Sequence, residues 1–435
     1  MKRLTFTPAL FISIALASPA FASQPLTVDE VVLRALGNSD RIEAARAAQE
    51  GSRQQEKSAR ADRLPSLDAS YGYMRFAQTP IAKIGGVERE TSHDGVHKWQ
   101  LTATQPLFTG FALEAKEEIA RLDTLSLSEQ TERTKQAIAA EAKIACYDVL
   151  LAYELHKVAA EAVKSLTEHR DNAGRFFEQG LQPRNELLKS EVALADAVQE
   201  KVRAQANLQL VRTRLALLAD LDGEFELIPP TSGWHLTEAV GDYNELIGEA
   251  LDSRPELKAR RLVSEKLDSQ EKAAKGAYLP KVNLIAAYER TGDSISASNN
   301  DYSNDHNTWV GVNLTMNIFD WCRKKSRING VRASRNAEDA LTSQLKKEIA
   351  VEVKQAHLSV QVARANIDTA RSALEQAREN NHITKLQYEQ QLATSADVLD
   401  ARTFLTRAET NYLGALYGHL SALTRLEFSV GRIVN

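Results

Sequence analysis

The sequence predicts a chain of mixed α and β structure in which a unit of helix, strand pair and long helical hairpin occurs twice. First, "ALGNSDRIEAARAAQE" resembles "ALDSRPELKARRLVSE" at an offset of 215, and "FEQGLQPRNELLKS" resembles "YEQQLATSADVLDA" at an offset of 211. Second, the hydrophobic period changes from 3.6 to 2 after each of two Leu-Pro pairs. Third, residues 107–182 contain no proline, and none follows Pro280, which leaves room for very long helices.

The N-terminus is typical of a secretory signal. Two basic residues precede a mostly apolar run, and an A-x-A cleavage site at residues 20–22 stands before Ser23. We therefore expect residues 1–22 to be removed outside the cytoplasm, and no cysteine follows the cleavage site to carry a lipid anchor. Removal of Lys2 and Arg3 takes the formal charge from −4 to −6, which gives no reason to expect nucleic acid.

Each half is expected to open with a helix followed by a strand pair. In the first half, Thr27 and Glu30 have the spacing of a capping box, and the helix is expected to run to about Arg63. Leu64-Pro65 then ends it, because proline disfavours helix in the preceding residue. The residues that follow alternate between apolar and polar, as in a strand with two different faces. The same alternation recurs at residues 99–104, 282–288 and 310–316.

The strand pairs are separated by two expected helical hairpins. Residues 112–179 and 323–391 can each form one unbroken helix, roughly 100 Å long at 1.5 Å per residue. Such lengths indicate coiled-coil packing. Short breaks at residues 180–183 and 391–395 allow a second helix to return in each half.

Four strands of about ten residues are long enough to cross a membrane when tilted, but they cannot close a barrel alone. An open edge in hydrocarbon leaves backbone groups unsatisfied, so other copies of the chain would have to complete the barrel. Two copies give eight strands, which side chains normally fill, and three give twelve with room for a lumen. A soluble β-hairpin packed on helices is the alternative. The residues alone leave these possibilities open.

The other groups of reactive residues give little evidence for a catalytic or metal site. Cys146 and Cys322 are expected to be two separate thiols, buried or partly buried, because nothing in the sequence brings them together. His93 and His97 are four residues apart, but they lie in a predicted surface loop and are weak evidence for a metal site. The sequence has no phosphate-binding glycine loop, nucleophile elbow or metalloprotease motif. It therefore predicts no enzyme activity, no cofactor and no metal.

The doubled order of elements resembles the TolC family of trimeric outer-membrane efflux and secretion ducts. The segments that carry the resemblance are "LPSLDASYGY", "QPLFTGF", "FEQGLQPRNELL" and "YEQQLATSADVLDA", and it covers essentially the whole mature chain. It implies that each chain contributes four strands to a trimeric twelve-stranded β-barrel standing on a long α-helical coiled-coil barrel that crosses the periplasm. The loops at residues 79–95 and 292–306 would then face outside.

The resemblance also implies a domain order and a function. After the signal peptide at residues 1–22, residues 23–230 form the first repeat and residues 231–435 the second. The expected function is that of a passive outer-membrane conduit in a tripartite efflux or type I secretion system. A homotrimer would work with a periplasmic adaptor and an inner-membrane pump. The alternative is a soluble periplasmic coiled-coil adaptor or scaffold.

Asp397 and Asp400 have two interpretations. Ser395 is a suitable N-cap, and carboxylates in the first turn are favoured by the helix dipole, so the residues alone favour a capping role. The resemblance implies instead that the two aspartates form acidic rings around the pore aperture at the periplasmic end. Both roles can hold for Asp397. Such rings would attract cations and bind divalent ions weakly.

The resemblance implies further roles for the two hairpin tips. Glu186 and Tyr388 match an acid and a tyrosine of the network that closes the periplasmic end, but the matching arginine position is Ala393, and Arg184 is a candidate substitute. From the residues alone, Glu186 is an ordinary acidic residue near the start of a helix.

The tips are also the expected contacts for the adaptor. The first tip, Gly180-Leu181, keeps the family's Gly-Leu pattern, whereas the second, Gln391-Leu392, has lost the glycine.

Overall fold

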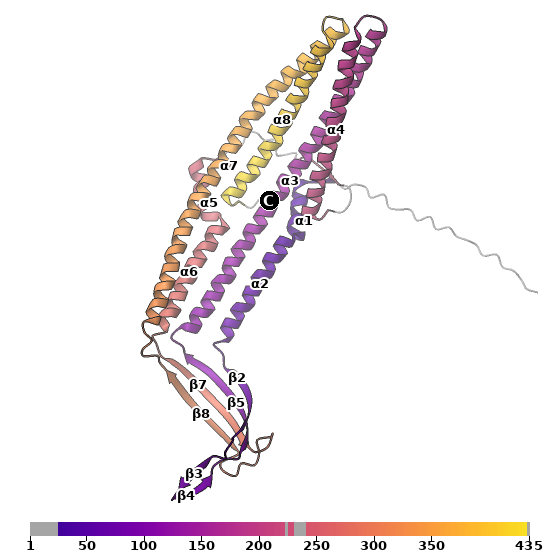
Figure 1. Cartoon of the computed structure of the whole chain (residues 1–435). Coiled ribbons are helices and arrows are strands. Elements are labelled where there is room, and N and C mark those ends of the chain that lie inside the picture. The colour runs from indigo at the N-terminus through magenta and orange to yellow at the C-terminus, as the bar shows by residue number, and fades with distance from the viewer. Residues whose placement is uncertain (1–24, 222–224, 230–240, 433–435) are drawn as a thin grey trace, which may run out of the picture. The chain divides into compact units, whose positions relative to one another are not determined.

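The computed structural model describes residues 25–221, 225–229 and 241–432, and these fall into two compact units (Figure 1). The tip unit comprises Met1–Ala35, Ala142–Leu236 and Gln376–Leu413, and the sheet unit comprises Leu36–Glu141, Thr237–Glu375 and Gly414–Asn435. The expected signal peptide and the expected repeat boundary at residues 230 and 231 lie outside the described residues. None of the described helices is both long enough and apolar enough to cross a membrane.

The first helical segment of the chain is divided. Strand β1 (Pro25–Leu26) pairs in parallel with β6 (Glu226–Leu227), and α1 (Val28–Asn38) follows. The predicted capping box is confirmed: the Thr27 N–H donates to Glu30 Oε2 over 2.8 Å and the Glu30 N–H to Thr27 Oγ1 over 3.3 Å.

The prediction of one helix to Arg63 was wrong. Ser39 has an extended backbone at φ −75° and ψ 118°, so that a separate helix α2 runs from Asp40 to Ala61. The second half contains a similar break, between α5 (Tyr243–Ser253) and α6 (Pro255–Gly276). There Arg254 is extended because it precedes a proline.

Four antiparallel strands form the main sheet, in the order β2 (Ser66–Arg75), β5 (Gly95–Phe108), β7 (Lys281–Gly292) and β8 (His306–Thr315). The apolar residues predicted for one face do align across it, since Ala69 pairs with Leu101 and Leu101 with Tyr288. The two edge strands β2 and β8 each have a strand neighbour on one side only among the described residues. Nearly every residue of these two strands is exposed.

A small hairpin lies within the segment predicted as a polar loop at residues 79–95. It consists of β3 (Ile81–Ile84) and β4 (Val87–Glu90). The two residues between the strands, Gly85 and Gly86, both have positive φ, as a tight hairpin turn requires.

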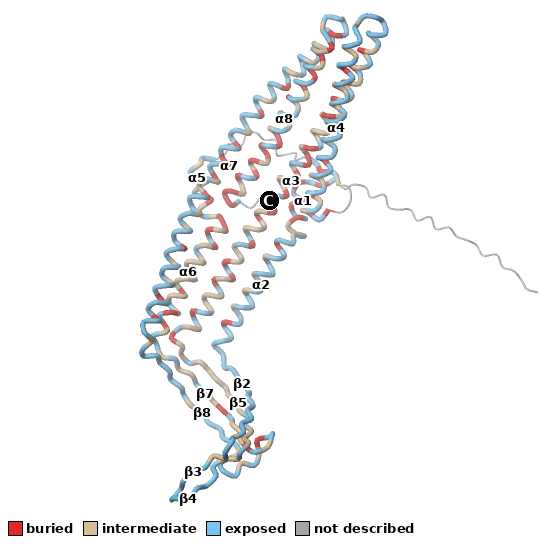
Figure 2. The backbone as a smooth tube through the Cα atoms, viewed as in Figure 1, coloured by how far each residue is buried: buried red, intermediate tan, exposed pale blue. Residues whose placement is uncertain are grey.

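The predicted long hairpins are confirmed. The first consists of α3 (Ala112–Glu178) and α4 (Arg184–Ala219), and the second of α7 (Arg323–Glu389) and α8 (Ser395–Val430). Figure 2 shows buried positions recurring along the helices. In α7 the buried residues Val353, Val360, Ile367 and Leu374 are seven positions apart, the repeat of a coiled coil.

The core of the sheet unit joins both helices of the second hairpin to α5 and α6. Its buried members are Leu246, Ala250, Leu257, Ile349, Val353, Val360, Ala422, Leu426 and Val430. Beside it the fully buried Arg254 pairs with Glu352 at 2.7 Å. Arg254 also lies 3.3 Å from Glu256 on α6, so the two carboxylates together compensate the buried charge at the junction between α5 and α6.

Two glycines make the closest backbone approach of the sheet unit, where α6 ends near the start of α3. A Cβ atom built on Gly276 would lie 1.8 Å from the carbonyl oxygen of Gly110. Gly110 itself has a φ of +65°. Only glycine lacks the Cβ atom that would clash at residue 276 and adopts the positive φ at residue 110 without strain.

The two cysteines are free thiols, as predicted, but the expectation that both are buried or partly buried was wrong for Cys322. Cys146 is buried, and the loss of solvation raises the pKa of its thiol to about 12, whereas Cys322 is exposed.

Candidate functional site at the hairpin tips

Both long helices end in the same backbone motif. At the first tip the Gly180 N–H donates to the Phe177 carbonyl over 2.9 Å and the Leu181 N–H to the Phe176 carbonyl over 2.8 Å. At the second tip, Gln391 and Leu392 make the equivalent bonds, to Tyr388 over 2.9 Å and to Gln387 over 2.8 Å. These are Schellman caps, in which one residue adopts the left-handed conformation.

The left-handed residue is Gly180 at the first tip and Gln391 at the second, with φ of +72° and +62°. The lost glycine noted in the sequence therefore leaves the backbone geometry unchanged. At both tips the motif presents an exposed leucine, Leu181 or Leu392, beside the turn.

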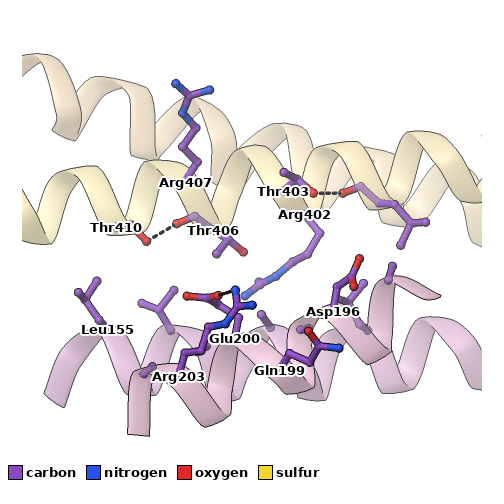
Figure 3. Close-up of a pocket in the computed structure, with 18 of the residues that line it drawn as sticks. Leu155, Asp196, Gln199, Glu200, Arg203, Arg402, Thr403, Thr406, Arg407 and Thr410 are labelled. Atoms are coloured by element: carbon purple, nitrogen blue, oxygen red, sulfur yellow. Dashed lines mark hydrogen bonds and ion pairs between the residues drawn. The ribbon is translucent and has the colours of Figure 1, made fainter. Parts of the chain in front are cut away.

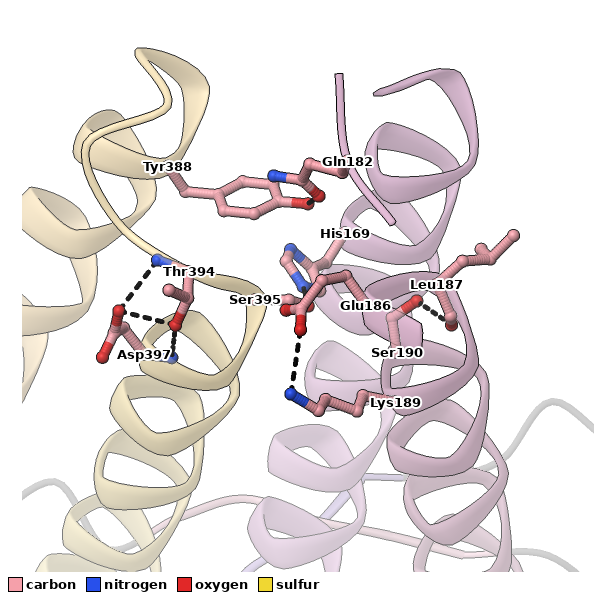
Figure 4. Close-up of polar contacts among 10 residues, drawn as sticks. All are labelled: His169, Gln182, Glu186, Leu187, Lys189, Ser190, Tyr388, Thr394, Ser395 and Asp397. Carbon is pink, nitrogen blue, oxygen red and sulfur yellow. Dashed lines mark hydrogen bonds and ion pairs between the residues drawn. The ribbon is translucent and has the colours of Figure 1, made fainter. Parts of the chain in front are cut away.

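Asp397 closes a capping box at the start of α8. Its Oδ2 accepts hydrogen bonds from the Thr394 N–H over 2.8 Å and from the Thr394 hydroxyl over 2.7 Å, and its own N–H donates to Thr394 Oγ1 over 3.3 Å (Figure 4). The N-cap is therefore Thr394, and the expectation that Ser395 caps the helix was wrong. The hydrogen bonds from Thr394 lower the pKa of the Asp397 carboxyl.

Asp400 is different from Asp397, although the two are one helical turn apart. It is exposed, and in the described part of the chain it makes no hydrogen bond or ion pair. It lines a shallow groove between α4 and α8, together with Lys189 and Asp196. Of the two aspartates, only Asp400 has both carboxylate oxygens without a hydrogen bond or ion pair among the described residues.

Tyr388 is buried at the end of α7, where it contacts the first hairpin. Its hydroxyl donates to Gln182 Oε1 over 3.0 Å, and its ring centroid lies 4.7 Å from that of His169 (Figure 4). The Phe176 ring centroid lies 5.7 Å from that of Tyr388. Burial raises the pKa of the Tyr388 phenol. The hydroxyl is therefore a neutral donor.

His169 and Ser395 form a second contact between the hairpins, which the sequence did not reveal. The imidazole Nε2 lies 2.6 Å from Ser395 Oγ, and both residues are buried. Burial lowers the pKa of His169 to about 4, with a smaller effect of Lys385 in the same direction. His169 is therefore a neutral hydrogen-bonding group at neutral pH.

Glu186 lies near this cluster. Its Oε1 accepts from Lys189 Nζ over 2.8 Å, and its Oε2 is buried without a hydrogen-bond partner. Arg184 is exposed and makes no hydrogen bond or ion pair with Glu186 or Tyr388. The structure thus brings Glu186 and Tyr388 into one neighbourhood and leaves Arg184 out of it.

A groove of about 840 Å³ runs among α3, α4 and α8 further from the tip (Figure 3). The buried side chain of Arg402 reaches across it, and its nearest carboxylate is that of Glu409, 3.9 Å from the guanidinium. Burial raises the pKa of Glu409. The Thr403 and Thr410 hydroxyls are occupied, because each donates to a carbonyl four residues earlier.

Among the described residues, no group of three His, Cys, Asp or Glu side chains has the arrangement of a metal site. His93 lies 3.8 Å from Asp301, and His97 bonds to the Tyr71 hydroxyl over 2.7 Å.

The sequence matches the model of the family described as outer membrane efflux protein over residues 31–219 and 246–432. Among curated proteins it is 26% identical to the cobalt-zinc-cadmium resistance protein CzcC of Cupriavidus metallidurans, over 95% of this chain and 92% of CzcC. It is 22% identical to the outer membrane protein TolC of Vibrio cholerae, over 100% of this chain and 96% of TolC. Among solved structures, CusC superposes with a TM-score of 0.80 at 16% identity, covering 93% and 92% of the two chains.

Proposed function

Because this chain belongs to the outer membrane efflux protein family, and is thus an outer-membrane channel that extends into the periplasm and not an enzyme, we propose that it is the passive exit duct of a tripartite efflux or type I secretion system. Family membership does not favour the alternative of a soluble periplasmic adaptor or scaffold. The duct makes and breaks no bond: cargo enters at the periplasmic end and leaves outside the cell.

The observation that carries this proposal is the open sheet. Strands β2 and β8 are its edges, and β8 exposes Val310, Val312 and Leu314. The strands alternate in direction, so β8 of one copy can pair with β2 of the next without a mismatch. We propose that three copies close a twelve-stranded barrel in this way, with the helical hairpins continuing it as a coiled-coil tunnel.

Fractionation and native mass spectrometry test the duct and its stoichiometry. The protein is expected to fractionate with the outer membrane and to be extracted by detergent as a homotrimer. In planar bilayers it is expected to form cation-preferring channels. A soluble periplasmic monomer would contradict the proposal.

We propose that the two tips bind a periplasmic adaptor that couples the duct to an inner-membrane pump. The exposed side chains of Leu181 and Leu392, each held beside a rigid Schellman cap by Gly180 or Gln391, support this. Crosslinking from a photoreactive residue placed at 181 or 392 is expected to capture the adaptor. The same residue at 217, an exposed leucine far along α4, is the control.

We further propose that Asp397 and Asp400 form the acidic rings of the aperture and that Glu186, Tyr388 and Arg184 belong to the region that closes it. Asp400 supplies the more accessible charge, since one oxygen of the Asp397 carboxylate is bonded to Thr394. In this proposal the mature chain consists of two repeats, residues 23–230 and 231–435, each ending in one hairpin.

A further inference from the structure

We propose that His169 and Ser395 form the latch that holds the two hairpins of each chain together at the periplasmic end. This inference rests on the proposed duct. It assigns the closing contact to a pair of residues outside the network of Glu186, Tyr388 and Arg184, and so accounts for closure in a chain that has Ala393 where an arginine is expected.

The latch joins elements that are far apart in the sequence. His169 lies on α3 of the first hairpin, and Ser395 is the first residue of α8 in the second (Figure 4). Their side chains meet over 2.6 Å although 226 positions separate them. The contact therefore links the hairpins directly, and it must break if they move apart.

The surroundings make the contact costly to open. Ser395 is 0% exposed and His169 6% exposed, and the Tyr388 ring lies against the imidazole at a tilt of 53°. Water therefore cannot replace the lost partner of either group until the hairpins have separated. The Tyr388 hydroxyl, bonded to Gln182 of the first hairpin, adds a second link beside the first.

A third polar contact between the hairpins in this unit is weaker. Lys385 and Glu168 lie 3.3 Å apart, but both side chains are roughly half exposed, so solvent screens the ion pair. Arg184, the candidate substitute for the missing arginine, makes no hydrogen bond or ion pair with the second hairpin in the part of the chain that the structure describes. The buried pair is the link with the best geometry at this tip.

Channel conductance in planar bilayers tests the latch. Ser395→Ala removes a single oxygen atom, and we expect it to raise the resting conductance of the trimer several-fold. His169→Ala is expected to do the same, and His169→Gln, whose amide can reach Ser395, to restore a low conductance. Ser190→Ala is the matched control, because Ser190 is also 0% exposed but bonds to Leu187 within its own helix.

The outcomes separate the latch from the duct. Equal conductance in wild type and Ser395→Ala would overturn the latch and leave the duct intact. An equal rise in Ser190→Ala would also overturn it, because any lost buried hydroxyl would then open the channel. A wild-type protein without channel activity would overturn the duct itself, and the latch with it.

Discussion

At the scale of single residues, the two tips allow a direct comparison of glycine and glutamine in one backbone conformation. Gln391 adopts the left-handed geometry that Gly180 adopts at the other tip. A side chain in this conformation is unfavourable, whereas glycine adopts it readily.

We therefore expect Gln391→Gly to stabilise the protein by about 1 kcal/mol, and Gly180→Ala to destabilise it by a similar amount. Nothing lies within 4 Å of a Cβ built on Gly180, so the second effect comes from the backbone alone. Urea unfolding measures both changes. Shifts of the same sign in the two variants would contradict the argument.

A second prediction concerns Asp397 and Asp400, the acidic residues of the proposed aperture. Asp400→Asn is expected to raise the Mg²⁺ concentration that blocks half of the channel current more than Asp397→Asn does. The reason is that Thr394 already bonds to one oxygen of the Asp397 carboxylate, whereas Asp400 is exposed and makes no hydrogen bond or ion pair among the described residues. Bilayer recordings over a Mg²⁺ series measure the block. An unchanged block in Asp400→Asn would remove that residue from the aperture.

A third prediction follows from the lowered pKa of His169. The unfolded chain takes up a proton near the ordinary pKa of about 6.5, but the folded chain takes it up only near pH 4. The stabilisation is therefore complete above pH 6.5 and is lost as the pH falls toward 4. Hydrogen exchange at the tips, measured from pH 7 to 4, should show a steeper loss of protection in wild type than in His169→Gln. Parallel profiles would contradict this.

The sequence revealed single residues of the site better than their partners. Asp397, Glu186 and Tyr388 were singled out by the resemblance to the TolC family, and Glu186 also matches Asp397 through the repeat. Their partners could not be found in this way, because Tyr388 meets Gln182 across 206 positions and His169 meets Ser395 across 226. Contacts of this kind depend on the register of two packed helices, which periodicity alone does not determine.

At the scale of elements, the errors in the expected helices and loops have local causes. The break at Ser39 stands in the sequence Gly-Asn-Ser-Asp, whose residues stop one helix and start another, but the apolar period continues through it. The hairpin at 81–90 was missed because its strands are only four residues long. The Gly85-Gly86 pair was the feature of the sequence that indicated a hairpin turn. The long helices were predicted correctly because no proline or glycine pair interrupts them.

The glycine contact between α3 and α6 gives a prediction for these elements. Gly276→Ala is expected to destabilise the protein by about 3 kcal/mol or more, because its Cβ would overlap the Gly110 carbonyl and only a backbone shift can relieve the clash. Gly330→Ala, in open space on α7, is the control and is expected to stabilise by about 1 kcal/mol. Thermal unfolding distinguishes them; a tolerated Gly276→Ala would contradict the close packing.

At the scale of the whole molecule, the edge strand β8 offers a test of the proposed barrel. Val312 and Asn313 are neighbours on opposite faces of β8. If the valine faces lipid, Val312→Arg should destabilise the assembled trimer by about 2 kcal/mol or more, and Asn313→Arg should be tolerated. The yield of native trimer from the outer membrane measures this. Equal losses in both variants would contradict a lipid-facing row.

The open sheet also affects how the protein is made. A single chain that entered the bilayer alone would place the backbone of β2 and β8 in hydrocarbon without partners. If three copies close the barrel as proposed, insertion and association must occur together, and the stability of the protomer depends on its concentration. A mutant chain with a blocked β8 edge would then prevent closure of every trimer that it joins. Such a mutation should be dominant when mutant and wild-type chains are expressed in one cell.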